Sequence, residues 1–236
     1  MGVFRFKDFS VSDGSSAMKV GTDAVLLGAA MTLLPSDRNL LDAGTGCGVI
    51  ALMAARRLAA LGCEPSISAI DIDPGAISDA CSNFASSPWA GFLYAECTPL
   101  ARYLPGKPLD LIFSNPPYFE QSLKNPDARS AAARHTESLS YRELCSYAEA
   151  ALGPEGRLSM ILPAGAESDL IRTAAASGLY PFRLLRIRST ATKAYSRLIA
   201  EFCTRRTACR EDELTLLAPD GSRSPEYSTL TGEFYL

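Results

Sequence analysis

Four short apolar segments of this sequence each end in a polar residue, and they are linked by stretches typical of turns and helices. The polar residues are Asp42, Asp71, Glu96 and Asn115. Alternation of this kind predicts an α/β fold, with a mostly parallel sheet and helices on both faces. Open parallel sheets bind ligands outside the carboxyl ends of their strands. We therefore expect one ligand site at the edge where these strands end.

The fourth of these strands, from about Asp110 to Phe113, runs directly into Asn115, Pro116, Pro117 and Tyr118. Two prolines end it, because proline cannot donate a hydrogen bond to a sheet ladder. The strand end would then present two fixed acceptors beside an aromatic ring. The acceptors are the carboxamide oxygen of Asn115 and the carbonyl oxygen of Pro116.

This set suits a planar substrate that carries an amino group. Such a nitrogen is a poor nucleophile because its lone pair is delocalised, and two acceptors that hold both N–H bonds favour the geometry that localises it. Stacking of a base on Tyr118 would add roughly 1–3 kcal/mol. The alternative interpretation is a plain strand-terminating turn, since Pro-Pro marks turns generally. Asn115, Pro116, Pro117 and Tyr118 are our candidate catalytic residues.

After the first strand, Asp42 is followed by Gly44, Gly46 and Gly48, and a helix is expected from about Val49. Glycines allow a tight turn and a close approach of the backbone to a ligand, and such a turn suits any nucleoside cofactor. Two details favour S-adenosylmethionine over NAD. Asp42 would repel a pyrophosphate and attract an ammonium group, and the glycine spacing does not match G-x-G-x-x-G.

The second and third strands add an acid each to the same edge. Asp71 ends the second strand, where ribose hydroxyls are held in folds of this type. Glu96 ends the third and is expected to contact the adenine amino group, with a surface acid as the alternative. We place the neighbouring Ile72 and Cys97 in the same cofactor site. Residues 18–23, Met-Lys-Val-Gly-Thr-Asp, lead into a short apolar helix for which Thr22 or Asp23 suits the N-cap.

Positive charge is concentrated late in the chain. Residues 181–210 hold eight basic residues and one acid, a net charge of +7 on a chain whose net charge is −3. A basic face fits a polyanion, and solvated strand edges are the alternative of equal weight. The polar segment 119–139 is expected to form a loop beside the site. The candidate RNA contacts are Arg134, His135, Arg186, Arg188, Lys193 and Arg197.

Composition excludes several classes of protein. A mean hydropathy of +0.05 and 47% hydrophobic residues are typical of a soluble globular domain. No stretch reaches the 18 or so apolar residues of a membrane span, and residues 1–10 lack the apolar core of an export signal, so we expect a cytoplasmic protein without a membrane partner. Seven cysteines with no Cys-x-x-Cys pair and a single histidine argue against a disulfide framework and a metal site. The length fits one domain, residues 1–236, with residues 1–36 as an amino-terminal segment packed on it.

Together the glycine turn, Asp71 and Asn-Pro-Pro-Tyr resemble the class I S-adenosylmethionine-dependent amino-methyltransferases. Three segments narrow the resemblance to the bacterial valine-tRNA adenine-N6 methyltransferases, which modify the adenosine immediately 3′ of the anticodon. They are residues 17–23 (Ala-Met-Lys-Val-Gly-Thr-Asp), 87–90 (Ser-Pro-Trp-Ala) and the tail with Tyr-Ser-Thr-Leu at 227–230 and Phe-Tyr-Leu at 234–236. The similarity runs from about Phe4 to Leu236.

The resemblance implies a Rossmann-like, seven-stranded sheet, S-adenosylmethionine as cofactor and tRNA as partner, and we expect a monomer without a metal. It places Asp42, Gly44 and Gly46 around the methionine part of the cofactor, and Lys19, Thr22 and Asp23 near it. Asn115 would lie against both cofactor and substrate. The remaining alternatives are an enzyme that methylates amino groups of ribosomal RNA or DNA, one that methylates protein glutamine, and a non-catalytic binding module.

Overall fold

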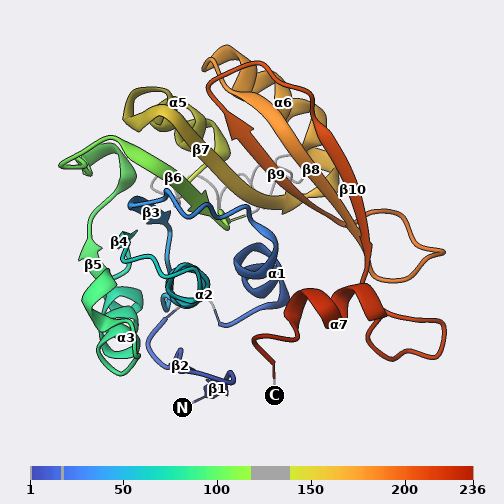
Figure 1. Cartoon of the computed structure of the whole chain (residues 1–236), viewed down its shortest axis with the longest axis horizontal. Helices are drawn as coiled ribbons and strands as arrows, with labels where there is room; N and C mark the ends of the chain where they lie inside the picture. Colours follow the sequence, from blue (N-terminus) through green and yellow to red (C-terminus); the bar gives the residue numbers. More distant parts are fainter. Residues whose placement is uncertain (1, 17–18, 118–138, 236) are drawn as a thin grey trace, which may run out of the picture.

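The computed structural model describes residues 2–16, 19–117 and 139–235. One eight-stranded sheet forms its centre, in the order β10-β8-β9-β7-β6-β3-β4-β5, and only β9 runs antiparallel to the others (Figure 1). The strands are β3 (Asn39–Ala43), β4 (Ser66–Asp71), β5 (Leu93–Cys97), β6 (Leu109–Ser114), β7 (Leu152–Pro163), β8 (Tyr180–Arg188), β9 (Arg197–Cys203) and β10 (Arg210–Thr215).

Helices cover both faces of the sheet (Figure 1). One core holds α1, α2, α3 and α7, and the other holds α5 and α6. Their bounds are α1 (Thr22–Ala30), α2 (Val49–Ala60), α3 (Pro74–Ala85), α5 (Tyr141–Ala151), α6 (Glu167–Ala176) and α7 (Pro225–Thr231). Successive side chains of β6 point to opposite faces of the sheet. Leu111 and Phe113 therefore pack in the first core and Ile112 packs in the second.

Side-chain caps begin helices α3 and α5. Asp73 caps α3 by accepting a hydrogen bond from the N–H of Gly75, with Pro74 at the first helical position. Ser140 caps α5 by accepting one from the N–H of Glu143 at 3.1 Å. The N-cap expected at Thr22 or Asp23 is wrong: Gly21 occupies that position in extended conformation and offers no side-chain cap.

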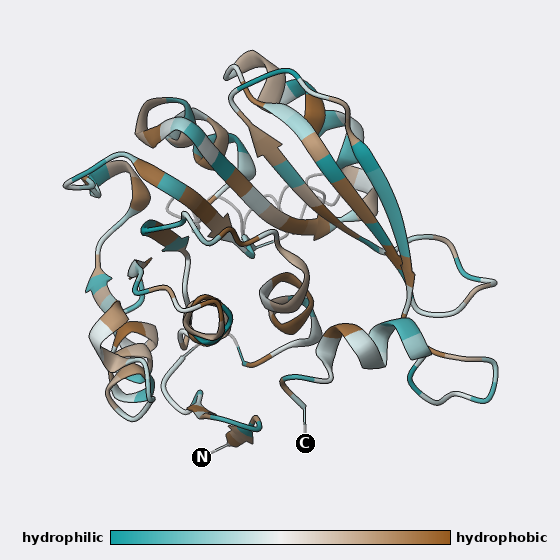
Figure 2. Ribbon diagram, viewed as in Figure 1, coloured by the Kyte–Doolittle hydropathy of each residue, from teal (hydrophilic) through white to brown (hydrophobic). Residues whose placement is uncertain are grey.

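The sheet has eight strands where seven were expected, and the addition is β10. Its sequence, Arg-Glu-Asp-Glu-Leu-Thr, lacks the alternation that signals a strand because β10 lies at the sheet edge and only Leu214 is buried. In Figure 2 it is the hydrophilic strand at the outer edge of the sheet. A second addition is a short hairpin of β1 (Val3–Arg5) and β2 (Ser10–Ser12).

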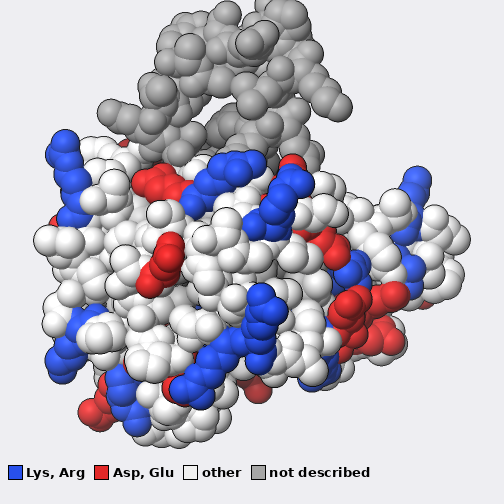
Figure 3. All heavy atoms as spheres, turned by 90° about the horizontal axis from the view of Figure 1, so that it is seen from above, with Lys and Arg blue, Asp and Glu red and all other residues white. Residues whose placement is uncertain are grey.

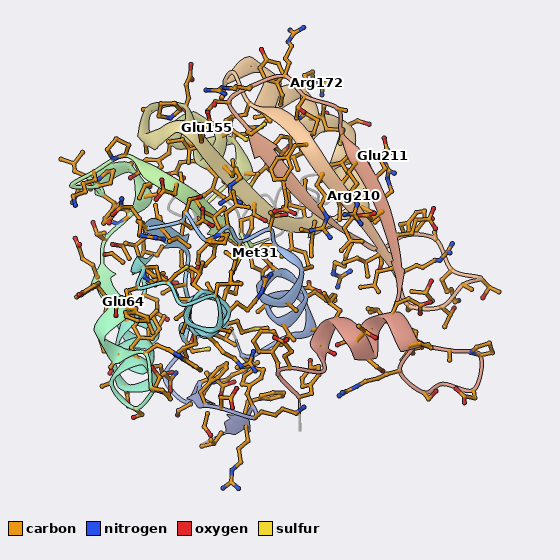
Figure 4. All side chains as sticks on the ribbon, viewed as in Figure 1. Met31, Glu64, Glu155, Arg172, Arg210 and Glu211 are labelled. Carbon is orange, nitrogen blue, oxygen red and sulfur yellow. The ribbon has the colours of Figure 1, made fainter. Side chains whose placement is uncertain are left out.

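The carboxyl end of α1 is fastened by arginines from distant parts of the chain. Arg57 donates to the carbonyls of Gly28 and Met31, both at 2.9 Å. Arg183 donates to the carbonyl of Ala30 at 2.6 Å and Arg157 to that of Thr32 at 3.0 Å. The last carbonyls of a helix have no partner within it, so these guanidinium groups satisfy them. Figure 4 labels Met31 at this end of α1.

Arg157 also forms a buried ion pair with Asp37, Nη2 to Oδ1 at 2.5 Å. The side chains are 7% and 3% exposed. We predict that Asp37→Ala lowers the free energy of unfolding by about 3–5 kcal/mol, because it leaves a buried cation without its counter-charge. The matched control is Asp169→Ala, which breaks the exposed pair with Arg172 and should cost under about 1 kcal/mol. Equal losses in urea denaturation of the two variants would contradict this.

Candidate active site

The site forms where the strand order reverses. β3 lies between β4 and β6, so the chain builds β4 and β5 on one side of β3 and then crosses to build β6 and β7 on the other. Asp42 is in register with Phe113, which brings the turn after β3 next to the residues after β6. Ser114 Oγ donates to the carbonyl of Ala43 at 2.6 Å and ties the two strand ends together. Such a switch point is where open α/β sheets bind ligands.

The turn after β3 depends on glycine. Gly44, Gly46 and Gly48 have φ values of 72°, 55° and 84°, in the left-handed region. A Cβ on Gly48 would lie 2.4 Å from the ring of Phe84, so a side chain there would also clash with α3. The N–H groups of Gly44 and Thr45 both donate to the carbonyl of Ile70 at 2.9 Å, which fixes the turn against the end of β4.

Asp71 organises the next part of the edge. Its carboxylate accepts the N–H of Gly46 at 2.9 Å and the N–H of Asp73 at 3.0 Å. The residue is half-buried, and a carboxylate has about four acceptor positions, so it can accept further hydrogen bonds from a ligand. The predicted residue for the ribose is therefore held rigidly at the edge of the sheet.

Asp42 lies beneath the turn, and its side chain is completely buried. One carboxyl oxygen accepts from Thr45 Oγ1 at 2.7 Å, while the other, Oδ1, has no hydrogen-bond partner in the part of the chain that the structure describes. Desolvation by burial raises the pKa of Asp42 to about 7. Asp42 thus supports the turn from inside, and the orphaned oxygen is one group that a bound cation or water could satisfy.

A cavity opens between the ends of β4 and β5 and the start of α5. Three predicted residues line it, namely Gly44, Asp71 and Ile72. The sequence analysis missed its other lining residues, which are Ile70, Thr98, Pro99, Leu100, Leu139 and Glu143. The apolar members offer flat contact for a ring and Asp71 offers acceptors, so the lining fits a nucleoside. A Cβ on Gly44 would narrow it, meeting Leu139 at 3.1 Å.

Glu96 and Cys97 lie at the end of β5 and are exposed, and neither lines this cavity. The strand continues to Cys97, one residue beyond the predicted end, so Thr98 takes the place at its tip. The N–H of Thr98 donates to the carbonyl of Asp71 at 3.0 Å. A residue immediately after a parallel strand is a candidate site residue. Thr98 does not meet this criterion in the prediction because the predicted strand ends one residue too early.

The predicted residues around the start of α1 are Lys19, just before the helix, and Thr22 and Asp23, in its first turn. Lys19 is exposed, and its ammonium group donates to the carbonyls of Asp13 and, at 3.2 Å, Ser16. Asp23 accepts Arg197 Nε on both carboxylate oxygens, at 2.9 and 2.8 Å. A predicted cofactor contact and a predicted RNA contact are therefore bound to each other. Thr22 is exposed at the first position of α1.

Three of the four candidate catalytic residues are described. Asn115 and Pro117 are half-buried and Pro116 is buried, all immediately after β6 and beside the glycine turn. Tyr118, Arg134 and His135 lie outside the described residues, as does most of the expected loop 119–139.

The basic stretch is largely neutralised by acids that the sequence interval did not contain. Arg186 pairs with Glu167 at 2.9 Å and Glu211 at 2.8 Å, which raises its pKa. Arg188 pairs with Glu213 at 3.3 Å. Glu211 and Glu213 come from β10, whose position Figure 4 marks with Arg210 and Glu211. The face drawn in Figure 3 shows acidic and basic side chains intermixed rather than one basic patch.

Lys193 is the exception among the four described RNA candidates. It is exposed, and its ammonium group makes no ion pair within residues 2–16, 19–117 and 139–235. It lies between β8 and β9, a connection that leaves the sheet at the carboxyl end of β8. Since β8 is parallel to β6, that is the edge where Asn115 lies.

Other features bear on partners. In the described ranges no helix has the length and apolarity needed to cross a bilayer. Neither is there, among these residues, a group of three or more His, Cys, Asp or Glu side chains placed to hold a metal ion.

Comparison with known proteins places these features in context. Residues 16–169 match the family model for the methyltransferase small domain. The tRNA1(Val) (adenine(37)-N6)-methyltransferase of Bacteroides fragilis is 38% identical over 99% of this chain and 97% of its own. That of Photobacterium profundum is 38% identical over 99% and 98%. A crystal structure of a predicted O-methyltransferase from Agrobacterium tumefaciens has a similar fold, with a TM-score of 0.67, 15% identity, and coverage of 90% of this chain and 96% of that one.

The buried carboxyl of Asp42 predicts a pH dependence of stability. Its pKa is raised from 3.8 to about 7 in the folded protein, so between these values the folded state holds a proton that the unfolded state has lost. The contribution of Asp42 to stability is therefore highest below this range and falls with rising pH, by up to about 1.4 kcal/mol per pH unit. Asp42→Asn, which cannot ionise, should flatten this slope in urea denaturation across the range. Parallel pH profiles for wild type and variant would contradict it.

Proposed function

The chain belongs to the methyltransferase small domain family, and within it to the tRNA1(Val) (adenine(37)-N6)-methyltransferases; we propose that it transfers a methyl group from S-adenosylmethionine to N6 of adenosine 37 in valine tRNA. The observation that carries the proposal is the switch point, where Asn-Pro-Pro lies beside the glycine turn, together with relatives that match nearly the full chain. We further propose that the enzyme works as a cytoplasmic monomer.

The cavity beside β4 is the proposed adenosine site. Asp71 accepts the ribose hydroxyls, and Ile72, with Leu100 opposite, packs against the adenine ring. The glycine turn lets the methionine part approach the backbone, with Gly44 and Gly46 beneath it. Bound there, S-adenosylmethionine supplies a methyl group activated by the positive sulfonium. We also propose that the remaining predicted residues lie around it, namely Lys19, Thr22, Asp23, Glu96 and Cys97.

The substrate side of the site is built by the residues after β6. An adenine rotated out of the anticodon loop would place its amino group between the Asn115 carboxamide oxygen and the Pro116 carbonyl, with Tyr118 stacked on the ring. Pro116 and Pro117 restrict the backbone around both acceptors. Held in this way, N6 would be oriented with its lone pair toward the sulfonium methyl group, and the residues after β6 would contribute to catalysis chiefly by this positioning. The proton that N6 must then lose would pass to solvent water, because a carboxamide and a backbone carbonyl are not bases.

Binding the tRNA phosphates needs cationic side chains at the carboxyl ends of the parallel strands, where Asn115 lies. Lys193 is the best-placed described candidate because it is exposed, free of ion pairs there and at the carboxyl edge. Arg186, Arg188 and Arg197 reach phosphates only while sharing their carboxylate partners. Arg134 and His135 follow the catalytic motif in sequence and complete the proposed set.

The direct test is methyl transfer from labelled S-adenosylmethionine to total bacterial tRNA, followed by nucleoside analysis. Label in N6-methyladenosine, absent from tRNA that lacks the valine isoacceptor, is the expected result. Cofactor binding without label in tRNA would contradict the proposed substrate. Ribosomal RNA and a glutamine-containing peptide would then be tested as acceptors.

We predict that Asn115→Ala abolishes detectable transfer, because the adenine amino group loses its side-chain acceptor. Cofactor affinity should stay within a few-fold, since the adenosine cavity is lined by other residues. Single-turnover transfer and calorimetric binding of S-adenosylhomocysteine measure the two effects separately. Near wild-type turnover in the variant would refute the role of Asn115.

Lys193→Ala should raise the KM for tRNA and leave the KM for the cofactor unchanged, because one phosphate contact is lost. We also expect a shallower dependence of log KM on log salt, by about one unit of slope. The matched control is Lys107→Ala. Lys107 is exposed and lies just before β6, at the amino end of the parallel strands and so opposite to the proposed site. The same change in both variants would show that only overall charge matters.

A further inference from the structure

Residues 12–16, which begin at the last residue of β2, lie against α3, and we call them the strap. Figure 1 shows β2 beside α3, with the chain continuing from there toward α1. Asn83 of α3 forms hydrogen bonds with both backbone groups of Ser12, at the start of the strap. Its carbonyl oxygen accepts the N–H of Ser12 at 2.8 Å, and its amide nitrogen donates to the carbonyl of Ser12 at 2.8 Å.

The same amide nitrogen reaches the glycine turn. It donates to the carbonyl of Cys47 at 2.8 Å, in a bond that is buried. Asn83 is 4% exposed, and both its N–H groups and its oxygen are used. A carboxylate of the same shape could accept but not donate, so aspartate could not replace it. Asn83 therefore sets the distance between strap and turn.

Asp79, one helical turn earlier, holds the other end of the strap. A single carboxylate oxygen accepts the N–H groups of Ser15 and Ser16, at 2.8 and 2.7 Å. Backbone packing adds to this contact, since a Cβ on Gly75 would lie 2.6 Å from the carbonyl oxygen of Ser15. Gly75 does not need a left-handed conformation, so glycine is favoured there by close contacts, of which the strap carbonyl is the tightest and Asp73 Oδ1, at 3.2 Å from such a Cβ, is the next.

The strap ends next to Gly46 of the glycine turn. Ser16 is 4% exposed, and its Oγ lies 3.8 Å from where a Cβ on Gly46 would be. The N–H of Gly46 is bound to Asp71, the proposed ribose residue. No residue of the strap lines the adenosine cavity, which is bounded by β4, β5 and α5. The strap thus approaches Gly46 outside the adenosine cavity.

We propose that the strap forms the wall against which the amino-acid part of S-adenosylmethionine binds, and that Asp79 and Asn83 are positioning residues that set this wall. The inference rests on the proposed cofactor. A ligand that begins in the adenosine cavity and continues past Asp71 over Gly46 meets Ser16 next. The side chains of Asp79 and Asn83 bond the backbone of the strap, so both residues act through that backbone.

The test compares two ligands that differ in the amino-acid part. S-adenosylhomocysteine carries it and 5′-methylthioadenosine does not, so the ratio of their dissociation constants isolates this part of the site. Calorimetry on the full chain gives the ratio for wild type, Asn83→Asp, Asp79→Ala and Gly75→Ala. We expect S-adenosylhomocysteine to weaken roughly tenfold or more in each variant, a change of about 1.4 kcal/mol, while 5′-methylthioadenosine changes less than twofold.

Controls separate positioning from general damage. Ser82→Ala, on the exposed side of α3, should leave both constants unchanged. Asp79→Asn keeps an oxygen that can accept both N–H groups and should restore most of the ratio. Gly75→Ala favours the helix while displacing the strap, so it remains informative if another variant fails to fold. Equal weakening of both ligands, or an unchanged ratio, overturns the strap proposal. Failure of wild type to bind either ligand overturns the proposed function as well.

Discussion

The contact between β3 and β6 is the constraint on which the rest of the molecule depends. Strand order reverses there, so the glycine turn that ends β3 and the Asn-Pro-Pro segment that ends β6 leave the sheet side by side. The hydrogen bond from Ser114 to the carbonyl of Ala43 fixes their relative height. One half of the sheet then supplies the proposed nucleoside cavity and the other the proposed acceptors for an amino group, an arrangement suited to methyl transfer between two bound molecules.

Much of this arrangement can be predicted from local patterns in the sequence. The ends of apolar runs predict Asp42, Asp71 and Asn115 at strand ends, and the chemistry of Pro74 and Ser140 suits the positions they hold at the starts of α3 and α5. Errors arose where a non-local contact decides the structure. β10 is a strand because β8 offers it a parallel edge, and its own residues give little sign of it.

The distribution of charge on the surface also depends on contacts that the sequence does not reveal. The interval 181–210 has a net charge of +7, but the sheet sets Glu211 and Glu213 of the neighbouring strand beside Arg186 and Arg188. The net charge of a segment is a property of the sequence alone, whereas the electrostatic potential at the surface depends on which strands are neighbours in the sheet. The Asp23–Arg197 pair, 174 residues apart in the chain, is a further contact that no local pattern reveals. The same holds for Asn83, whose three hydrogen bonds join the strap to the turn.

The most direct measurement of the central claim is a crystal structure of the protein with S-adenosylhomocysteine. The account predicts adenine in the cavity between Ile72 and Leu100, ribose hydroxyls on Asp71, and the sulfur over the glycine turn, facing Asn115. Ligand density at another place would contradict it. One such place is the groove between Tyr103 and Leu152, at the opposite edge of the sheet.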